Sequence, residues 1–260
     1  GGWLFVAKDK PSVSVEELQD GQSPASTEAY ALSDSAEGAL NSMKELPWGK
    51  LLGNTPIWAG TAAHCANNWG LYVILAWLPT FFSQRYGMDL GQSALYSIVP
   101  YLAGAVTSGG AGWIADKMLT EGMETTRVRK IMQAVGSFGP ALCMGLLAQQ
   151  SGNSDSVAES ALALFVASIA LSSASSAGFG TSLQDLSGRF SGLLYGVTSV
   201  FSSITGATGV YATGRILDEF HAWPLVFTCT GAVYTIGGLL FISGYNAKPI
   251  FEKGSPYADS

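Results

Sequence analysis

Long apolar segments alternate with short charged clusters along the chain after about residue 56. Six such segments have no Asp, Glu, Lys or Arg in their interiors, and at about 1.5 Å of rise per residue each can cross a hydrocarbon core of about 30 Å. They cover residues 57–83, 92–115, 131–150, 160–180, 190–214 and 222–245. The pattern predicts an all-α integral membrane protein with six transmembrane helices.

The first apolar segment, Ile57–Phe82, carries polar side chains that a lipid-facing helix does not need. Offsets of three and four positions put His64, Asn67, Asn68 and Tyr72 on one helical face. Unpaired polar groups are costly in hydrocarbon, so this face should point at protein or at a water-filled cavity. We expect a cavity-lining helix, in which the imidazole of His64 suits either substrate binding or proton coupling and the two amides are uncharged donors suited to an oxyanion. Hydrogen bonds between helices are the alternative for the first three residues, and core packing is the alternative for Tyr72.

The remaining segments are organised around these helices. Residues 1–7 are apolar but too short to span, and they are expected to be the tail of a preceding transmembrane helix. Residues 8–56 read as a polar central loop with a short interfacial helix near residues 46–52. Residues 57–245 would form the six-helix bundle, and residues 246–260 the C-terminal tail.

Charge is scarce and unevenly distributed. Charged residues make up 12% of the chain, against about 25% in soluble domains. Eleven of the 13 Lys and Arg residues fall on one side of the predicted spans, and only Arg85 and Arg215 fall on the other. Positive residues favour the cytoplasmic side, so both termini are expected on a cytosolic or stromal-type side. The basic residues form no stripe, which argues against nucleic-acid binding.

No cofactor or metal is expected from the cysteines. Cys65, Cys143 and Cys229 are widely spaced in apolar runs and are interpreted as buried free thiols.

Small residues mark places where helices can approach closely. Gly104, Ser108 and Gly112 repeat every four residues on the second span, as do Gly192 and Gly196 on the fifth. The fourth span is rich in Ser and Ala, and Ser172 and Ser176 are candidates for substrate contact as well as for close packing.

A series of short motifs runs along the chain: DKP at 9–11, HCANNWG at 64–70, LAWLPT at 75–80, GGAGWIAD at 109–116, TTRVRKIMQ at 125–133, GSFGPA at 136–141 and QDLSGRFSG at 184–192. In this order and spacing they resemble one family, the anion:cation symporters of the major facilitator superfamily. The segment at 184–192 is similar to the family's HQDIxPRYxG segment, with Leu183 and Gly188 in place of its His and Pro. A basic residue that vesicular glutamate transporters carry on the seventh helix aligns with Asn67, which disfavours glutamate as the substrate.

The resemblance implies that the chain is the C-terminal bundle of a twelve-helix major facilitator fold. Its partners would be a small anion, the lipid bilayer and the missing N-terminal six-helix half. The family implies secondary active transport by alternating access, with inorganic phosphate as the first candidate substrate and Na⁺ or H⁺ as coupling ion. An organic anion such as ascorbate, glutamate or a sialic-acid-like molecule is the alternative. The likeness is closest to the plant and algal plastid branch, which implies a plastid (chloroplast) membrane.

The resemblance also implies a gate. Asp116 and Lys117, followed by Arg127, Arg129 and Lys130, resemble the superfamily's loop motif, in which a carboxylate and basic groups hold one gating state. Asp185 and Arg189 bracket a short turn, where a local ion pair and helix capping are expected and coupling to the gate is the alternative.

A membrane enzyme such as an intramembrane protease is a remote alternative. Such an enzyme needs a nucleophile beside a base, or a pair of carboxylates, within the membrane. The predicted spans contain many serines. However, His64 is the only base inside a predicted span, and no Asp or Glu lies inside one. We therefore expect a protein that is not an enzyme.

Overall fold

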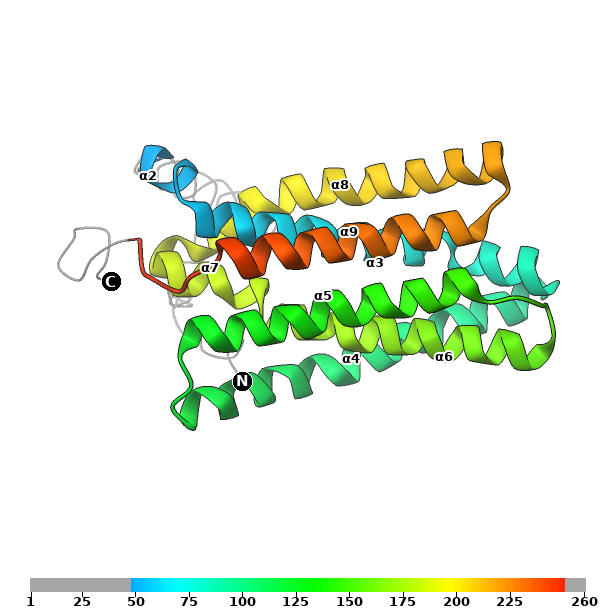
Figure 1. Ribbon diagram of the computed structural model, residues 1–260, viewed down its shortest axis with the longest axis horizontal. Helices are drawn as coiled ribbons and strands as arrows, with labels where there is room; N and C mark the ends of the chain where they lie inside the picture. The colour runs from blue at the N-terminus through cyan, green and yellow to red at the C-terminus, as the bar shows by residue number, and fades with distance from the viewer. Residues whose placement is uncertain (1–47, 251–260) are drawn as a thin grey trace, which may run out of the picture. The chain divides into compact units, whose positions relative to one another are not determined.

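The computed structural model describes residues 48–250, apart from the side chain of Arg189, and this part is helical without strands. The interpretations of residues 1–47 and 251–260 lie outside the described residues. Six long helices form a bundle in this part of the chain (Figure 1). They are α3 (Thr55–Tyr86), α4 (Leu90–Thr120), α5 (Thr125–Gln149), α6 (Asp155–Ser172), α8 (Ser191–Phe220) and α9 (Trp223–Gly244). The short elements are α2 (Trp48–Leu52), η4 (Ser173–Ser176), α7 (Phe179–Ser187) and η5 (Gly188–Phe190).

Successive long helices run in opposite directions along the bundle (Figure 1). Helix α3 contacts both α8 and α9, α9 also packs along α5, and α6 lies against α4 and α5. As a result, the start of α5, the end of α9 and helix α7 lie at the same end of the bundle (Figure 1). We call this the basic end, because Arg127, Arg129 and Lys130 of α5 lie there.

The helices agree with the predicted spans, and the all-α membrane fold is confirmed. Within residues 48–250, four segments are both long and apolar enough to cross a membrane: Thr125–Gln149, Asp155–Ser187, Ser191–Phe220 and Trp223–Gly244. Helices α3 and α4, with 32 and 31 residues, are also long enough to span but are not among these four segments. Several helices extend past the predicted limits. For example, α5 begins at Thr125 instead of residue 131, and α8 continues to Phe220 instead of ending at residue 214.

The fourth span was expected to be one helix over 160–180, followed by a turn over 181–189. In the structure α6 already begins at Asp155, a 3₁₀ turn follows at Ser173, and α7 is helical through Ser187. The break has a physical cause at Gly178, whose φ of −87° and ψ of −101° are not helical. A Cβ atom at Gly178 would lie 2.5 Å from Oε1 of Gln133 on α5, so only glycine fits this close approach.

Aromatic packing holds together the half of the bundle that lies away from α7. The ring of Phe81 contacts the rings of Phe165, Trp223 and Phe227 edge-on, with centroids 5.1 to 5.5 Å apart. Perpendicular ring contacts of this kind are favourable beyond simple burial. This cluster joins α3, α6 and α9.

Only some of the small residues serve the packing within this bundle. A Cβ atom on Gly104 would lie 2.6 Å from Ile169, so α4 and α6 approach closely there. By contrast, Gly112, Gly192 and Gly196 face open space within the described residues. These glycines leave room for another helix on α4 and α8.

Candidate functional site

The polar face of α3 faces helix α8. His64 is 4% exposed, and its ring nitrogens lie 3.3 Å from Oγ1 of Thr198 and 3.1 Å from Oγ of Ser202. Asn68 donates to the same Ser202 oxygen at 2.9 Å. Thr198 and Ser202 are four residues apart on α8, so they lie one above the other on one side of that helix. The structure therefore brings His64 and Asn68 into one hydrogen-bonded chain.

The hydrogen bonds around His64 can be satisfied in either protonation state. In the neutral tautomer that is protonated at Nδ1, Nδ1–H donates to Thr198 and Nε2 accepts from Ser202, while Thr198 donates onward to the carbonyl of Tyr195 at 3.1 Å. When Nε2 gains a proton, the Ser202 hydroxyl can turn and donate to the carbonyl of Ser199 at 3.0 Å. A single hydroxyl rotation therefore accommodates gain or loss of a proton at His64.

Two aromatic rings enclose the imidazole. The ring of Phe179 is stacked on His64 with centroids 4.7 Å apart, and the ring of Tyr195 lies 5.2 Å away on a similar tilt. Aromatic faces attract a cation, so this enclosure tolerates a charged imidazole better than aliphatic side chains would. It also links His64 directly to the first residue of α7.

The other two predicted residues of this face occupy different surroundings. Tyr72 packs its ring on α8 at Gly206, where a Cβ atom would lie 2.5 Å from the ring. Asn67 has a buried Oδ1 atom that has no hydrogen-bond partner among the described residues. Buried polar atoms are normally paired, so Oδ1 of Asn67 is an acceptor on this face that no described residue satisfies.

The predicted serines of the fourth span bond locally. Ser172 donates to the carbonyl of Ile169 at 2.9 Å, and Ser176 donates to the carbonyl of Ser173 at 2.7 Å. Ser172 is partly buried and Ser176 is exposed. Neither hydroxyl is hydrogen-bonded to the polar face of α3.

The break between η4 and α7 is stabilised by a buried glutamine that the sequence interpretation did not single out. Gln133 on α5 is fully buried, and its Oε1 accepts from the backbone N–H of Phe179 at 3.0 Å. The first N–H groups of a helix have no partner within that helix, so Gln133 supplies an acceptor for the first N–H group of α7. Its Nε2 donates to Ser137 and to Ser175 at 2.9 and 3.3 Å. A polar residue inside an apolar segment was the signal that could have identified it.

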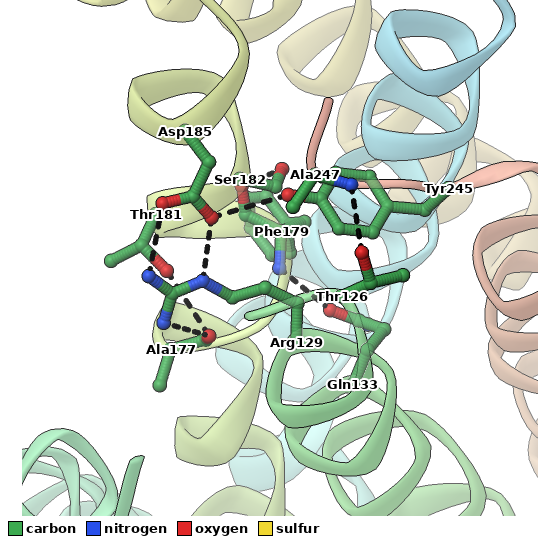
Figure 2. A network of polar contacts seen from close by, with 10 residues as sticks. All are labelled: Thr126, Arg129, Gln133, Ala177, Phe179, Thr181, Ser182, Asp185, Tyr245 and Ala247. Atoms are coloured by element: carbon green, nitrogen blue, oxygen red, sulfur yellow. Dashed lines mark hydrogen bonds and ion pairs between the residues drawn. The ribbon is translucent and has the colours of Figure 1, made fainter. Parts of the chain in front are cut away.

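A buried ion pair joins α5 to α7 (Figure 2). Nε and Nη2 of Arg129 donate to the two carboxylate oxygens of Asp185 at 2.7 and 3.2 Å, and Nη1 donates to the carbonyl of Ala177 at 3.3 Å. Arg129 is only 8% exposed. This two-pronged geometry is the strongest form of an arginine–carboxylate contact.

The end of α9 completes this network. The phenol of Tyr245 donates to Oδ2 of Asp185 at 3.2 Å, and the backbone N–H of Ala247 donates to Thr126 at 3.1 Å (Figure 2). Burial, followed by the neighbouring Asp185 carboxylate, raises the pKa of Tyr245 above its usual range, which keeps this phenol a donor. The network therefore ties three helices together at the basic end.

The other predicted gating residues lie at the same end, outside this network. Asp116 is exposed and takes part in none of the ion pairs of the described region. Lys117 lies 3.9 Å from Glu121 and over the ring of Trp113. Arg127 is exposed and Lys130 is partly exposed. Arg189 lies in η5, and its side chain is outside the described part of the structure.

No group of three or more His, Cys, Asp or Glu side chains that could hold a metal ion occurs within residues 48–250.

The chain belongs to the Major Facilitator Superfamily, whose sequence profile matches residues 1–210. It is 35% identical over 199 residues to "Probable anion transporter 1, chloroplastic" of Oryza sativa subsp. japonica, a match that covers 76% of this chain and 36% of the relative. It is 33% identical to "Sodium-dependent phosphate transport protein 1, chloroplastic" of Arabidopsis thaliana, over 76% of this chain and 38% of the relative. It is 34% identical to "Ascorbate transporter, chloroplastic" of Arabidopsis thaliana, over 75% of this chain and 35% of the relative.

These matches confirm the expected resemblance to anion transporters of the superfamily. The matched stretch spans less than half the length of each of these three relatives. The bundle is thus a multi-pass membrane domain of this superfamily. The relatives reported above are named as transporters, not as enzymes.

Proposed function

We propose that this bundle is the C-terminal half of a secondary transporter for a small anion, with inorganic phosphate as the first candidate. An N-terminal six-helix half would form the opposite wall of the cavity, and the two halves would rock about a site near the midplane. The superfamily match and the named phosphate-transporting relative support this proposal. The open glycine faces of α4 and α8 also support it, because they leave room for helices of another half.

The substrate site proposed here is the polar face of α3, made of His64, Asn67, Asn68 and Tyr72. Ser172 and Ser176 of the fourth span complete the proposed set. The observation that carries this proposal is the unpaired Oδ1 of Asn67, next to a histidine whose hydrogen bonds come only from hydroxyl groups. This oxygen can accept a hydrogen bond from a protonated oxygen of dihydrogen phosphate, and the Nδ2–H groups of an amide can donate to its other oxygens. Neither group carries a fixed charge, which lets the anion leave again.

Coupling is proposed to occur at His64 when the coupling ion is H⁺. A buried histidine that keeps its hydrogen bonds in both protonation states can take up a proton in one conformation and release it in the other. Coupling to Na⁺ is the alternative, favoured by the relative named as a sodium-dependent phosphate transport protein.

The gate proposed here is the Arg129–Asp185 pair, assisted by Tyr245. Asp116, Lys117, Arg127, Lys130 and Arg189 would contribute their charges at the same end of the bundle. A pair that is strong in one packing and separated in the other biases a two-state equilibrium. Since α5 and α7 must stay in contact for this pair to form, the observed arrangement would correspond to one of the two states.

Transport by the full-length protein tests these proposals. Labelled phosphate uptake into proteoliposomes would be driven by an imposed pH or Na⁺ gradient, with wild type beside His64→Ala and Asn67→Ala. We expect gradient-driven uptake that falls about tenfold or more in both variants, because each loses a donor worth roughly 1.5 kcal/mol. Normal transport by variants that insert correctly would overturn the site.

An organic anion is the second candidate, favoured by the relative named as an ascorbate transporter. Excess unlabelled ascorbate and glutamate in the same assay separate the two candidates. Uptake of labelled ascorbate without phosphate flux would transfer the assignment to the organic anion. The chloroplastic names of the relatives support a plastid membrane, with both termini on the stromal-type or cytosolic side.

A further inference from the structure

A groove with one charged and one apolar half opens between α5 and α9 at the basic end. It encloses a volume of about 430 Å³. Glu124, Thr126, Arg127 and Lys130 line it along the first turns of α5. Ile131 and Ala134 of α5 and Ile242 of α9 line it deeper in the bundle.

The cations of this groove pair with no carboxylate among residues 48–250. The ion pairs of the described region use Lys117, Arg129 and Arg215, and neither Arg127 nor Lys130 is in one. The groove therefore holds two cationic groups against the single carboxylate of Glu124. A guanidinium and an ammonium side by side match a phosphate group, because both donate several hydrogen bonds to its oxygens.

The apolar half continues into a surface that faces outward from the bundle. Val135 and Leu142 on α5 are 42% and 64% exposed, and Leu239 on α9 is 55% exposed. In a membrane-spanning bundle, such large exposed aliphatic side chains contact acyl chains. A free anion would need only the charged half of the groove, whereas a lipid uses both halves.

We propose that this groove binds an anionic membrane lipid, with its phosphate headgroup at Arg127 and Lys130 and one acyl chain along Ile131, Ala134 and Ile242. Basic pockets between transmembrane helices at the positively charged side of a membrane suit such headgroups.

Lipid bound there would also act on the proposed gate. This second effect rests on the proposed function, whereas the lipid binding itself does not. Thr126 lines the groove and accepts the hydrogen bond of Ala247, two residues beyond Tyr245, which bonds Asp185. A headgroup that holds the start of α5 against the end of α9 stabilises the arrangement in which the Arg129–Asp185 pair is closed.

Native mass spectrometry of the full-length protein tests the binding. The probes are phosphatidylglycerol and phosphatidylcholine with identical acyl chains. We expect a clear preference for phosphatidylglycerol, reduced about 30-fold in Arg127→Gln/Lys130→Gln, because each cation near a membrane surface contributes about five- to sixfold. The matched control is Arg85→Gln/Arg215→Gln, which removes two charges from the opposite end and should keep the preference.

Two further arms keep the result interpretable. Ile242→Trp fills the apolar half without changing charge and should also weaken phosphatidylglycerol binding, whereas millimolar inorganic phosphate should not displace the lipid. Equal binding of the two lipids, or an unchanged preference in the double variant, would overturn the proposal. Displacement by inorganic phosphate would also overturn it and assign the groove to a free anion. Thermal unfolding of every variant checks that loss of binding is not loss of fold.

Discussion

The guanidinium of Arg129 and the carboxylate of Asp185 meet through two hydrogen bonds although 56 positions separate them in the chain. Arg129 belongs to the long helix α5 and Asp185 to the short helix α7. The pair therefore depends on the break that turns the chain after α6. The stability of this end of the bundle and the proposed gate depend on the same contact.

Asp185→Asn is expected to destabilise the bundle strongly. The substitution keeps the side-chain volume but leaves the buried Arg129 without a counter-charge, which costs about 3 kcal/mol of unfolding free energy. Denaturant unfolding of the detergent-solubilised full-length protein measures this cost. Glu219→Gln is the control, because its pair with Arg215 is exposed and such pairs contribute less than about 1 kcal/mol. Similar small losses in both variants would contradict the importance given to the buried pair.

Gly136→Ala is expected to disturb the contact between α5 and the break. A Cβ atom there would lie 2.2 Å from Oγ and 2.6 Å from the backbone nitrogen of Ser175, so backbone must move, at a cost of about 1–3 kcal/mol. Gly145→Ala on the same helix is the matched control, since no atom lies within 4 Å of its Cβ position. Thermal unfolding of both variants should show a loss only for Gly136→Ala. If both melt like wild type, the two segments are not packed as closely as described.

Ser202→Ala is expected to impair proton coupling more than substrate binding. It removes the hydroxyl that pairs with His64 and Asn68, while Ser203→Ala removes an exposed hydroxyl next to it and serves as the control. Uptake driven by a pH gradient should fall about tenfold in Ser202→Ala, the effect of one hydrogen bond of roughly 1.4 kcal/mol. Phosphate exchange at equal pH should fall less, because exchange requires no net proton transfer. Equal loss in both assays would argue that Ser202 acts on binding or folding alone.

The six long helices could be predicted from the sequence. Each contains a long interior segment free of formal charge, and that property is local to the segment. The predicted fourth span failed at its ends because its break depends on residues elsewhere. Gly178 and the serines before it weaken the helix, but Gln133 of α5 caps the next helix and fixes where it begins.

The polar face of α3 was also visible in the sequence, since its members follow the helical repeat. What the sequence left open was which element the face meets. The structure turns it toward α8, where Thr198, Ser202 and Gly206 lie four residues apart and accommodate His64, Asn68 and Tyr72. That spacing on the fifth segment was a signal, but it becomes meaningful only once α3 and α8 are known to be neighbours.

The sequence by itself determined the helices, their number within the bundle and the faces that carry polar groups. These follow from hydrophobicity, length and the 3.6-residue repeat, which act within a single segment. Only the tertiary structure decided the partners: Arg129 for Asp185, Gln133 for the backbone of Phe179, and Ser202 for His64. Their identity depends on which helices lie side by side, because a hydrogen bond reaches only about 3 Å while the partners are 46 to 138 positions apart in the chain.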